Sequence, residues 1–151
     1  GSSTGTKDNY DGCFGISPIN NRASLIGFRD ITDGTSNTLL LGERTWTVGT
    51  APGNASSGNA LAINDATSTG NTGGIFDVLG NGTGAVNTTA APQITFSSAH
   101  PGGAQFAMAD ASVQFIPETI AYDNSILANA VGSAVYQRLM SRNDGQPVGD
   151  F

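Results

Sequence analysis

Basic residues and long apolar runs are both scarce in this sequence. Lys and Arg together number 6, against 12 Asp and Glu, and the formal net charge of the 151 residues is −6. The basic residues are scattered and form no stripe, which argues against nucleic acid and against an anionic membrane surface as partners. No apolar run approaches the ~18 residues that predict a membrane-spanning helix, so we expect membrane contact only through a segment outside these residues.

Cysteine and histidine are each present once. Cys13 is the only cysteine, which excludes an internal disulfide, and His100 is the only histidine. One residue of each kind cannot build the usual four-ligand zinc sites. A G-x-S-x-G nucleophile elbow, a P-loop and a dinucleotide-binding fingerprint are also absent from the sequence. We therefore expect no conventional cofactor.

Glycine and small polar residues take the place of charge. Charged residues make up 12% of the chain, and there are 21 glycines. This composition differs from that of highly charged disordered chains and is typical of a β-rich, loop-rich domain, so we interpret residues 1–151 as one domain. Residues 49–92 have few charges and few large apolar side chains. We expect them to form a long surface insertion.

Patterns on both sides of that insertion predict an antiparallel sheet. Residues 38–48 are rich in β-branched, aromatic and leucine side chains, which favours a strand, and a short strand is expected at 94–96. Residues 105–109 and 113–116 alternate with period two around a turn, which predicts a hairpin with one buried face. The hairpin residues expected to face inward are Phe106, Met108, Val113 and Phe115.

The chain ends on a helical pattern. Apolar residues between positions 126 and 139 recur at steps of three and four, which predicts a helix or two short helices. Gly145 is placed to follow the helix cap. The predicted fold class is therefore α+β, with an antiparallel sheet and long loops.

Residues 30–37 read D-I-T-D-G-T-S-N and predict a turn held by its own side chains. Oxygen atoms of Asp33, Thr35 and Asn37 are also of the kind that calcium prefers. The spacing is not that of an EF-hand loop, so local hydrogen bonding is the favoured interpretation, and a calcium site at Asp33 and Asn37 is the alternative.

His100 is the one candidate general base, and a hydrolase would have to pair it with Asp110 or Glu43. The intervening strand, at about 3.3 Å per residue, separates His100 from Asp110 by roughly 16 Å, so we expect no hydrogen bond between them. Each should instead bond backbone groups of its own turn or of a neighbouring strand. Glu43 would need a partner such as Arg29 if it is partly buried.

Three segments together resemble a known family of bacterial secreted proteins. They are D-I-T-D-G-T-S-N-T-L-L-L-G-E at 30–43, S-A-H-P-G-G-A-Q-F-A-M-A-D-A-S-V-Q-F-I at 98–116, and Y-Q-R-L-M-S-R-N-D-G-Q-P-V-G-D-F at 136–151. The second is similar to the prepilin-type processing-associated His-X9-Asp-Gly motif, with Ala111 where the family has glycine. Because alanine resists positive φ, we expect no positive-φ turn there. The family-motif residues in this chain are Asp33, Gly34, Ser36, Asn37, Glu43, His100, Pro101, Gly102, Gly103 and Asp110.

The resemblance implies a pilin-like or pseudopilin-like head of a domain of unknown function. Members of the family typically begin with a prepilin-type leader and a hydrophobic N-terminal helix, neither of which lies within these residues. The resemblance therefore implies export, leader processing by a prepilin peptidase, and anchorage by that helix in the periplasm, cell envelope or cell surface. The expected role is structural and non-enzymatic, in a type II secretion-like assembly with other pilin-like subunits, and the isolated head should be monomeric or weakly associating. The alternative role is an extracellular carbohydrate- or ligand-binding module that uses the 49–92 loops.

Overall fold

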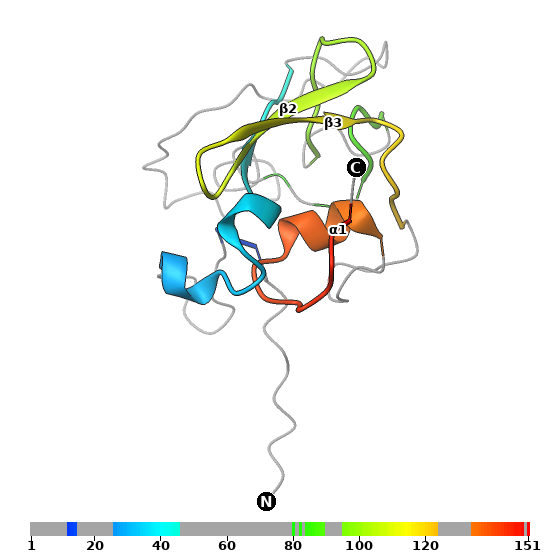
Figure 1. Cartoon of the computed structure of the whole chain (residues 1–151). Helices are drawn as coiled ribbons and strands as arrows, with labels where there is room; N and C mark the ends of the chain where they lie inside the picture. Colours follow the sequence, from blue (N-terminus) through cyan, green and yellow to red (C-terminus); the bar gives the residue numbers. More distant parts are fainter. Residues whose placement is uncertain are drawn as a thin grey trace, which may run out of the picture.

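The chain folds into a small mixed α+β structure, described in the computed structural model for residues 12–14, 26–45, 80, 82, 84–89, 95–123, 134–149 and 151. Figure 1 shows a sheet with a short helix beneath it. The elements in chain order are the 3-10 turns η1 (Phe28–Asp30) and η2 (Thr35–Asn37), the strands β1 (Leu39–Gly42), β2 (Gly103–Met108) and β3 (Val113–Pro117), and the helix α1 (Val135–Met140).

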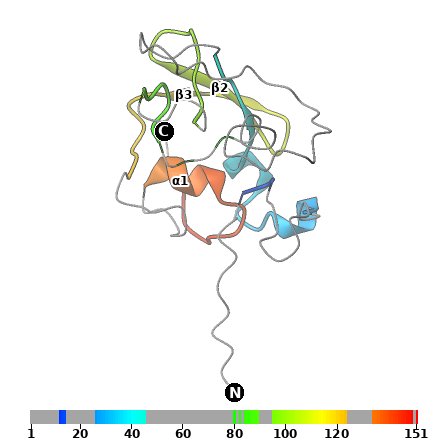
Figure 2. The same cartoon turned by 180° about the vertical axis from the view of Figure 1, so that it is seen from behind.

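The sheet is antiparallel, with the order β1-β2-β3, so β2 is its central strand. Period-two alternation along β2 places Ala104, Phe106 and Met108 on one face, where they are 0%, 1% and 0% exposed. The helix α1 lies on this face in both views (Figures 1 and 2) and contributes Tyr136 and Leu139, which are fully buried, to the same core. The inward residues Phe106 and Met108 are therefore confirmed, and the strand that carries them runs over Gly103–Met108 instead of the predicted 105–109.

The predicted inward residues of β3 are wrong. Val113 is 64% exposed and Phe115 is 43% exposed, whereas Ile116 is fully buried. Paired residues of an antiparallel sheet share a face, and Ile116 lies opposite Ala104 on the core side. Val113 and Phe115 consequently point to the outer side of the sheet. Alternation shows that successive side chains point to opposite faces of the sheet, but it does not show which set is buried. The turn between β2 and β3 decides this for β3.

That turn also corrects the expectation for Ala111, which adopts a φ of 69°. The amide of Ala111 donates to the Met108 carbonyl, and the amide of Ser112 donates to the Asp110 carboxylate at 2.9 Å. These two bonds impose the left-handed conformation that a glycine would adopt without strain. Alanine at position 111 thus occupies a left-handed backbone conformation in this turn.

The other predicted strands are shorter than expected. Only Leu39–Gly42 of the predicted strand 38–48 is paired, residues 43–45 continue without strand structure, and 46–48 lie outside the described residues. Thr95 and Phe96 form no strand, and Ile94 lies outside the described residues. A Cβ on Gly42 would stand 2.5 Å from the rings of Phe96 and Phe106, so glycine ends the strand where this aromatic pair needs the space.

The C-terminal helix lies within the predicted region, although residues 124–133 are outside the described part. Helix α1 ends at Met140 with Ser141 as its cap, so the placement of Gly145 beside the cap is wrong; Gly145, at φ 70°, belongs to the loop after the helix. In the described part of the chain, every helix is too short or too polar to cross a membrane.

The far end of the predicted insertion belongs to the core. Most of residues 49–92 lie outside the described residues, but Val86 is 3% exposed and packs in the main cluster. The amide of Asn87 donates to the Phe96 carbonyl, which ties this segment to residues 95–98. Val86 and Asn87 are therefore fixed beside residues 95–98, which precede the turn that carries His100.

Candidate functional site

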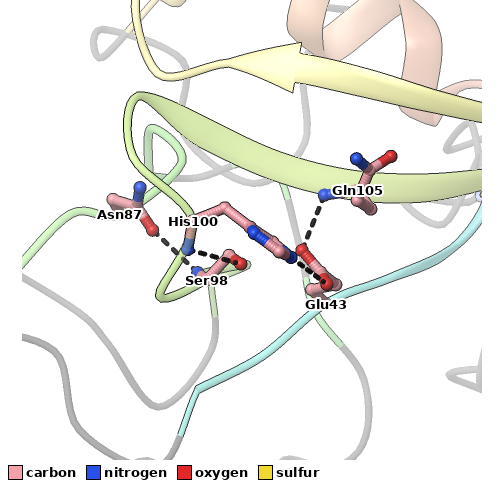
Figure 3. Close-up of polar contacts among 5 residues, drawn as sticks. All are labelled: Glu43, Asn87, Ser98, His100 and Gln105. Atoms are coloured by element: carbon pink, nitrogen blue, oxygen red, sulfur yellow. Dashed lines mark hydrogen bonds and ion pairs between the residues drawn. The ribbon is translucent and has the colours of Figure 1, made fainter.

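The candidate site lies where β1 ends beside β2. Glu43 comes directly after the last residue of β1, and its backbone amide donates to the Gln105 carbonyl at 3.1 Å. The Gln105 amide donates to a side chain instead of a backbone carbonyl: its acceptor is Oε2 of Glu43, at 2.8 Å (Figure 3). The Glu43 carboxylate thus continues the β1–β2 hydrogen-bond ladder beyond the end of the strand.

His100 reaches the same carboxylate from the turn before β2. Its Nε2 lies 3.3 Å from Oε1 of Glu43, and both side chains are partly exposed (Figure 3). The predicted partner of Glu43 was wrong: Arg29 instead lies 3.7 Å from the neighbouring Asp30 on the surface. The prediction that His100 bonds backbone groups of its own turn or of a neighbouring strand was also wrong for its ring, which contacts the Glu43 side chain.

A serine completes this cluster. Oγ of Ser98 accepts from the backbone amide of His100 at 3.2 Å, and its hydroxyl bonds the Glu43 carboxylate. Burial works against ionisation of Glu43, but the hydrogen bonds from Gln105 and Ser98 and the nearby His100 ring outweigh it and hold the pKa of Glu43 below its usual value. Glu43 is therefore a charged group at neutral pH.

Asn87 supports the turn from behind, and the sequence reasoning missed it. Its Oδ1 accepts from the Ser98 amide at 2.8 Å, and its Nδ2 donates to the Glu118 carboxylate at 3.2 Å. Asn87 has a φ of 62°, a conformation that asparagine adopts more readily than most residues. An asparagine at the end of a glycine-rich segment was the signal that could have marked it.

The order of these groups is not that of a catalytic triad. In a triad the imidazole stands between the hydroxyl and the carboxylate. Here the carboxylate of Glu43 is the shared partner, contacted both by the Ser98 hydroxyl and by the His100 ring. The arrangement instead holds the turn before β2 against the end of β1.

His100 and Asp110 lie at opposite ends of β2, as predicted, and no hydrogen bond joins them. The Asp110 carboxylate accepts from Ser112 within its own turn, and these hydrogen bonds lower the pKa of Asp110. The Asp110 amide donates to the Thr35 carbonyl at 3.1 Å, which ties this turn to η2. The His-X9-Asp spacing therefore measures the length of β2 between two turns.

Asp33 makes the longest connection among the motif residues. Its Oδ2 accepts from the Asp144 amide at 2.6 Å and its Oδ1 from the Gly145 amide at 3.0 Å. These two bonds, which we call the clasp, join the residues before β1 to the loop after α1. The predicted local role applies to Asn37, whose side-chain amide donates to the Asp33 carbonyl at 3.1 Å, whereas the Asp33 carboxylate reaches far along the chain.

The oxygen atoms proposed for calcium are arranged around this clasp. Both carboxylate oxygens of Asp33 already accept backbone N–H groups, and the Asn37 side chain acts as a donor. Across the described ranges, no cluster of three or more His, Cys, Asp and Glu side chains could hold a metal ion. The calcium site stays an untested alternative.

A second carboxylate stands beside the clasp. Burial is the largest influence on Asp144 and raises its pKa; the Asp33 carboxylate adds to this, while the Gln146 amide and Arg138 act in the opposite direction. The clasp therefore gathers two acidic groups, whereas the end of β1 gathers an acidic group and an imidazole.

The remaining motif residues shape the backbone of segments 30–43 and 98–116, which hold all the family-motif residues and which we call the two hallmark segments. Gly34 and Gly102 adopt φ values of 96° and 81°, where a side chain would be strained. Gly103 has no room for a Cβ, because it would collide with the Ile116 carbonyl and the Phe115 ring. Ser36 and Pro101 are exposed in their turns.

Comparison with known families accounts for most of the chain. A family model described as "Protein of unknown function (DUF1559)" matches residues 2–123. The chain belongs to this family. The match includes both hallmark segments, 30–43 and 98–116, and stops before the C-terminal segment 136–151. No curated protein and no solved structure matches the chain.

Proposed function

We propose that this DUF1559 chain is the head of an exported pilin-like or pseudopilin-like structural subunit. The observation that carries the proposal is the use made of its polar motif residues. Three motif carboxylates accept hydrogen bonds from backbone amides of the fold. Asp33 accepts from Asp144 and Gly145. Glu43 accepts from Gln105, and Asp110 accepts from Ser112. Carboxylates used in this way stabilise a scaffold rather than act on a substrate.

The two hallmark segments form one structural unit, which supports the same proposal. Segment 30–43 supplies β1, and segment 98–116 supplies β2 and most of β3, so the segments are neighbours in the sheet. The apolar face of that sheet packs on α1 (Figure 2). In the proposed subunit, a hydrophobic helix preceding residue 1 anchors the head in the envelope, and the partners are other pilin-like subunits.

The test is leader processing of the full-length gene product in its own host. A C-terminally tagged chain should lose its leader in the parent strain and remain at precursor size in a strain without prepilin peptidase, and it should fractionate with the cell envelope. A tagged protein exported by the general secretory route serves as the control and should mature equally in both strains. Processing that is independent of the peptidase would overturn the proposal.

A further inference from the structure

Within the described part of the chain, strand β3 is an edge of the sheet, and one side of its backbone has no neighbouring strand. The Met108 amide donates to the Ser112 carbonyl and the Glu118 amide to the Gly102 carbonyl, each at 2.8 Å. Because hydrogen-bonded pairs alternate along an antiparallel ladder, Gln114 and Ile116 turn their backbone groups toward β2. The residues whose backbone groups turn away from β2 are Val113, Phe115 and Pro117.

These outward groups could complete a further strand pair. Val113 and Phe115 each present one N–H and one C=O, and nothing in the described part of the chain bonds these groups. The Pro117 C=O is already used, because it accepts from the Ile120 amide at 3.0 Å. An unpaired edge of this kind is a template for an extended segment of another chain.

The outer face beside this edge is apolar. Val113 is 64% exposed and Phe115 is 43% exposed, and both lie on the side of the sheet away from α1. Across the sheet, Val113 pairs with Ala107 and Ala107 pairs with Leu41, which is 45% exposed. An added strand would place alternate side chains next to Val113 and Phe115 and bury part of this surface.

The charges at the two ends of β3 are acidic. Asp110 precedes the strand, Glu118 comes directly after it, and both are exposed. Hydrogen bonds lower the pKa of Asp110, so it is ionised at neutral pH. No Lys or Arg occurs between Arg44 and Arg138 in the sequence, which includes the whole of β2 and β3. Nothing within these strands neutralises the two carboxylates.

We propose that the free edge of β3 binds an extended segment of another protein that is apolar at alternate positions and carries a basic residue at each end. The unpaired backbone groups of β3 select an extended segment, and the apolar outer face selects apolar side chains at alternate positions of that segment. The carboxylates of Asp110 and Glu118 select a basic residue at each of its ends. A second copy of β3 fits less well, because antiparallel pairing about Phe115 would bring the acidic ends of the two strands together. This inference does not depend on the pilin-like role.

The first test uses a synthetic peptide, Lys-Ser-Val-Thr-Val-Thr-Val-Ser-Lys, titrated into the isotopically labelled chain. Backbone amide exchange should be slow for Gln114 and Ile116 with or without peptide, because those amides already face β2. The Val113 and Phe115 amides should exchange quickly in the free chain and become protected with peptide. The matched peptide with Glu at both ends should bind at least about threefold more weakly, a difference that salt reduces.

The second test uses two variants with exposed, apolar starting residues on the same face. Val113→Lys should abolish peptide binding, because it removes apolar surface at the edge and repels the basic peptide ends. Leu41→Lys, on the opposite edge strand, should leave binding within about twofold of the parent and shows that a lysine on this face does not itself unfold the sheet. Circular dichroism checks that both variants are folded.

Three results would overturn the proposal. The first is no protection of Val113 and Phe115 at the solubility limit of the peptide. The second is equal loss of binding in both lysine variants. The third is protection of the same amides by the chain alone as its concentration rises, which would identify a second copy as the occupant.

Discussion

Asp33 and Glu43 stand on either side of β1 and hold the fold in different ways. Asp33 precedes the strand and binds two backbone amides in a loop more than a hundred residues away along the chain, whereas Glu43 lies just beyond the strand and binds one amide of β2. The Asp33 end gathers a second carboxylate, and the Glu43 end gathers an imidazole. The comparison shows that the residue before β1 connects the strand to the loop after α1, whereas the residue after β1 holds the turn that carries His100.

The largest expected effect comes from breaking the clasp. Asp33→Ala removes two hydrogen bonds from a carboxylate and should lower the free energy of unfolding by about 2–3 kcal/mol, measured by urea denaturation. Ser36→Ala is the matched control, because Ser36 is exposed in the adjacent turn η2 and should change stability by less than about 0.5 kcal/mol. Equal stabilities of the two variants would mean that the clasp contributes nothing.

Breaking the other end should have a smaller effect. Glu43→Gln weakens the bond to the Gln105 amide and should lower the free energy of unfolding by about 1–2 kcal/mol at neutral pH. The pKa of Glu43 is lowered from 4.5 in the folded chain, so the folded state favours the ionised form. Its contribution is therefore present above pH 4.5 and is lost as the pH falls through the lower, folded-state value.

The measurement is a set of urea curves for the parent and Glu43→Gln from neutral to acid pH. The two curves should converge as the pH falls. Glu118→Gln is the control, since Glu118 is an exposed carboxylate that meets only the Asn87 side chain. A stability gap between parent and Glu43→Gln that stays constant with pH would contradict the assigned role of the charge.

The pair of carboxylates at the clasp predicts a change of opposite sign. The pKa of Asp144 is raised above 3.8, so the folded chain binds this proton more tightly than the unfolded chain and loses stability as the pH rises through that range. Asp144→Asn removes the ionisation while keeping an oxygen for the Gln146 amide. It should stabilise the chain by about 0.5 kcal/mol at neutral pH, a small effect because the side chain is only partly buried and solvent screens its repulsion from Asp33.

Thermal melts of parent and Asp144→Asn at neutral pH and near pH 3 provide the check. The gain should disappear at the lower pH, where Asp144 is protonated in the parent. Destabilisation by Asp144→Asn at neutral pH that disappears near pH 3 would show that the ionised carboxylate is needed.

The smallest effect is expected at His100. Its contact with Glu43 is between two partly exposed side chains, and such pairs contribute little. His100→Ala should therefore lower the free energy of unfolding by about 0.3 kcal/mol at neutral pH, well below the effect of Glu43→Gln. A loss as large as that of Glu43→Gln would indicate that the imidazole, rather than the Gln105 amide, is the important partner of the carboxylate.

Local patterns were enough to predict the hairpin and its turn. β2 and β3 are neighbours in the sequence, and period-two alternation together with Asp110–Ser112 reports both strands and their connection. The same patterns did not show which residues of β3 face the core. An edge strand exposes apolar residues on its outer face, so Val113 and Phe115 gave the same pattern that inward residues would give.

Long-range contacts left no local signal. The sequence suggested that Asp33 acts within its own turn, because short polar side chains commonly do so, and nothing near it pointed to Asp144 and Gly145. For Glu43, a need for a partner was correctly inferred from its apolar neighbours, but the identity of the partner depends on how the turn before β2 folds back. The pairing of motif segments in space therefore had to come from the structure.

Alanine at position 111 carries a final consequence for engineering the chain. Its left-handed backbone is set by hydrogen bonds of the surrounding turn, and the residue itself is strained in a conformation that glycine tolerates. Ala111→Gly should therefore raise the melting temperature by about 2 °C, in spite of the greater freedom of glycine in the unfolded chain. A variant library of this chain would meet an unusual position, at which deleting a methyl group improves heat tolerance. A melting temperature at or below that of the parent would show that the turn accommodates alanine without strain.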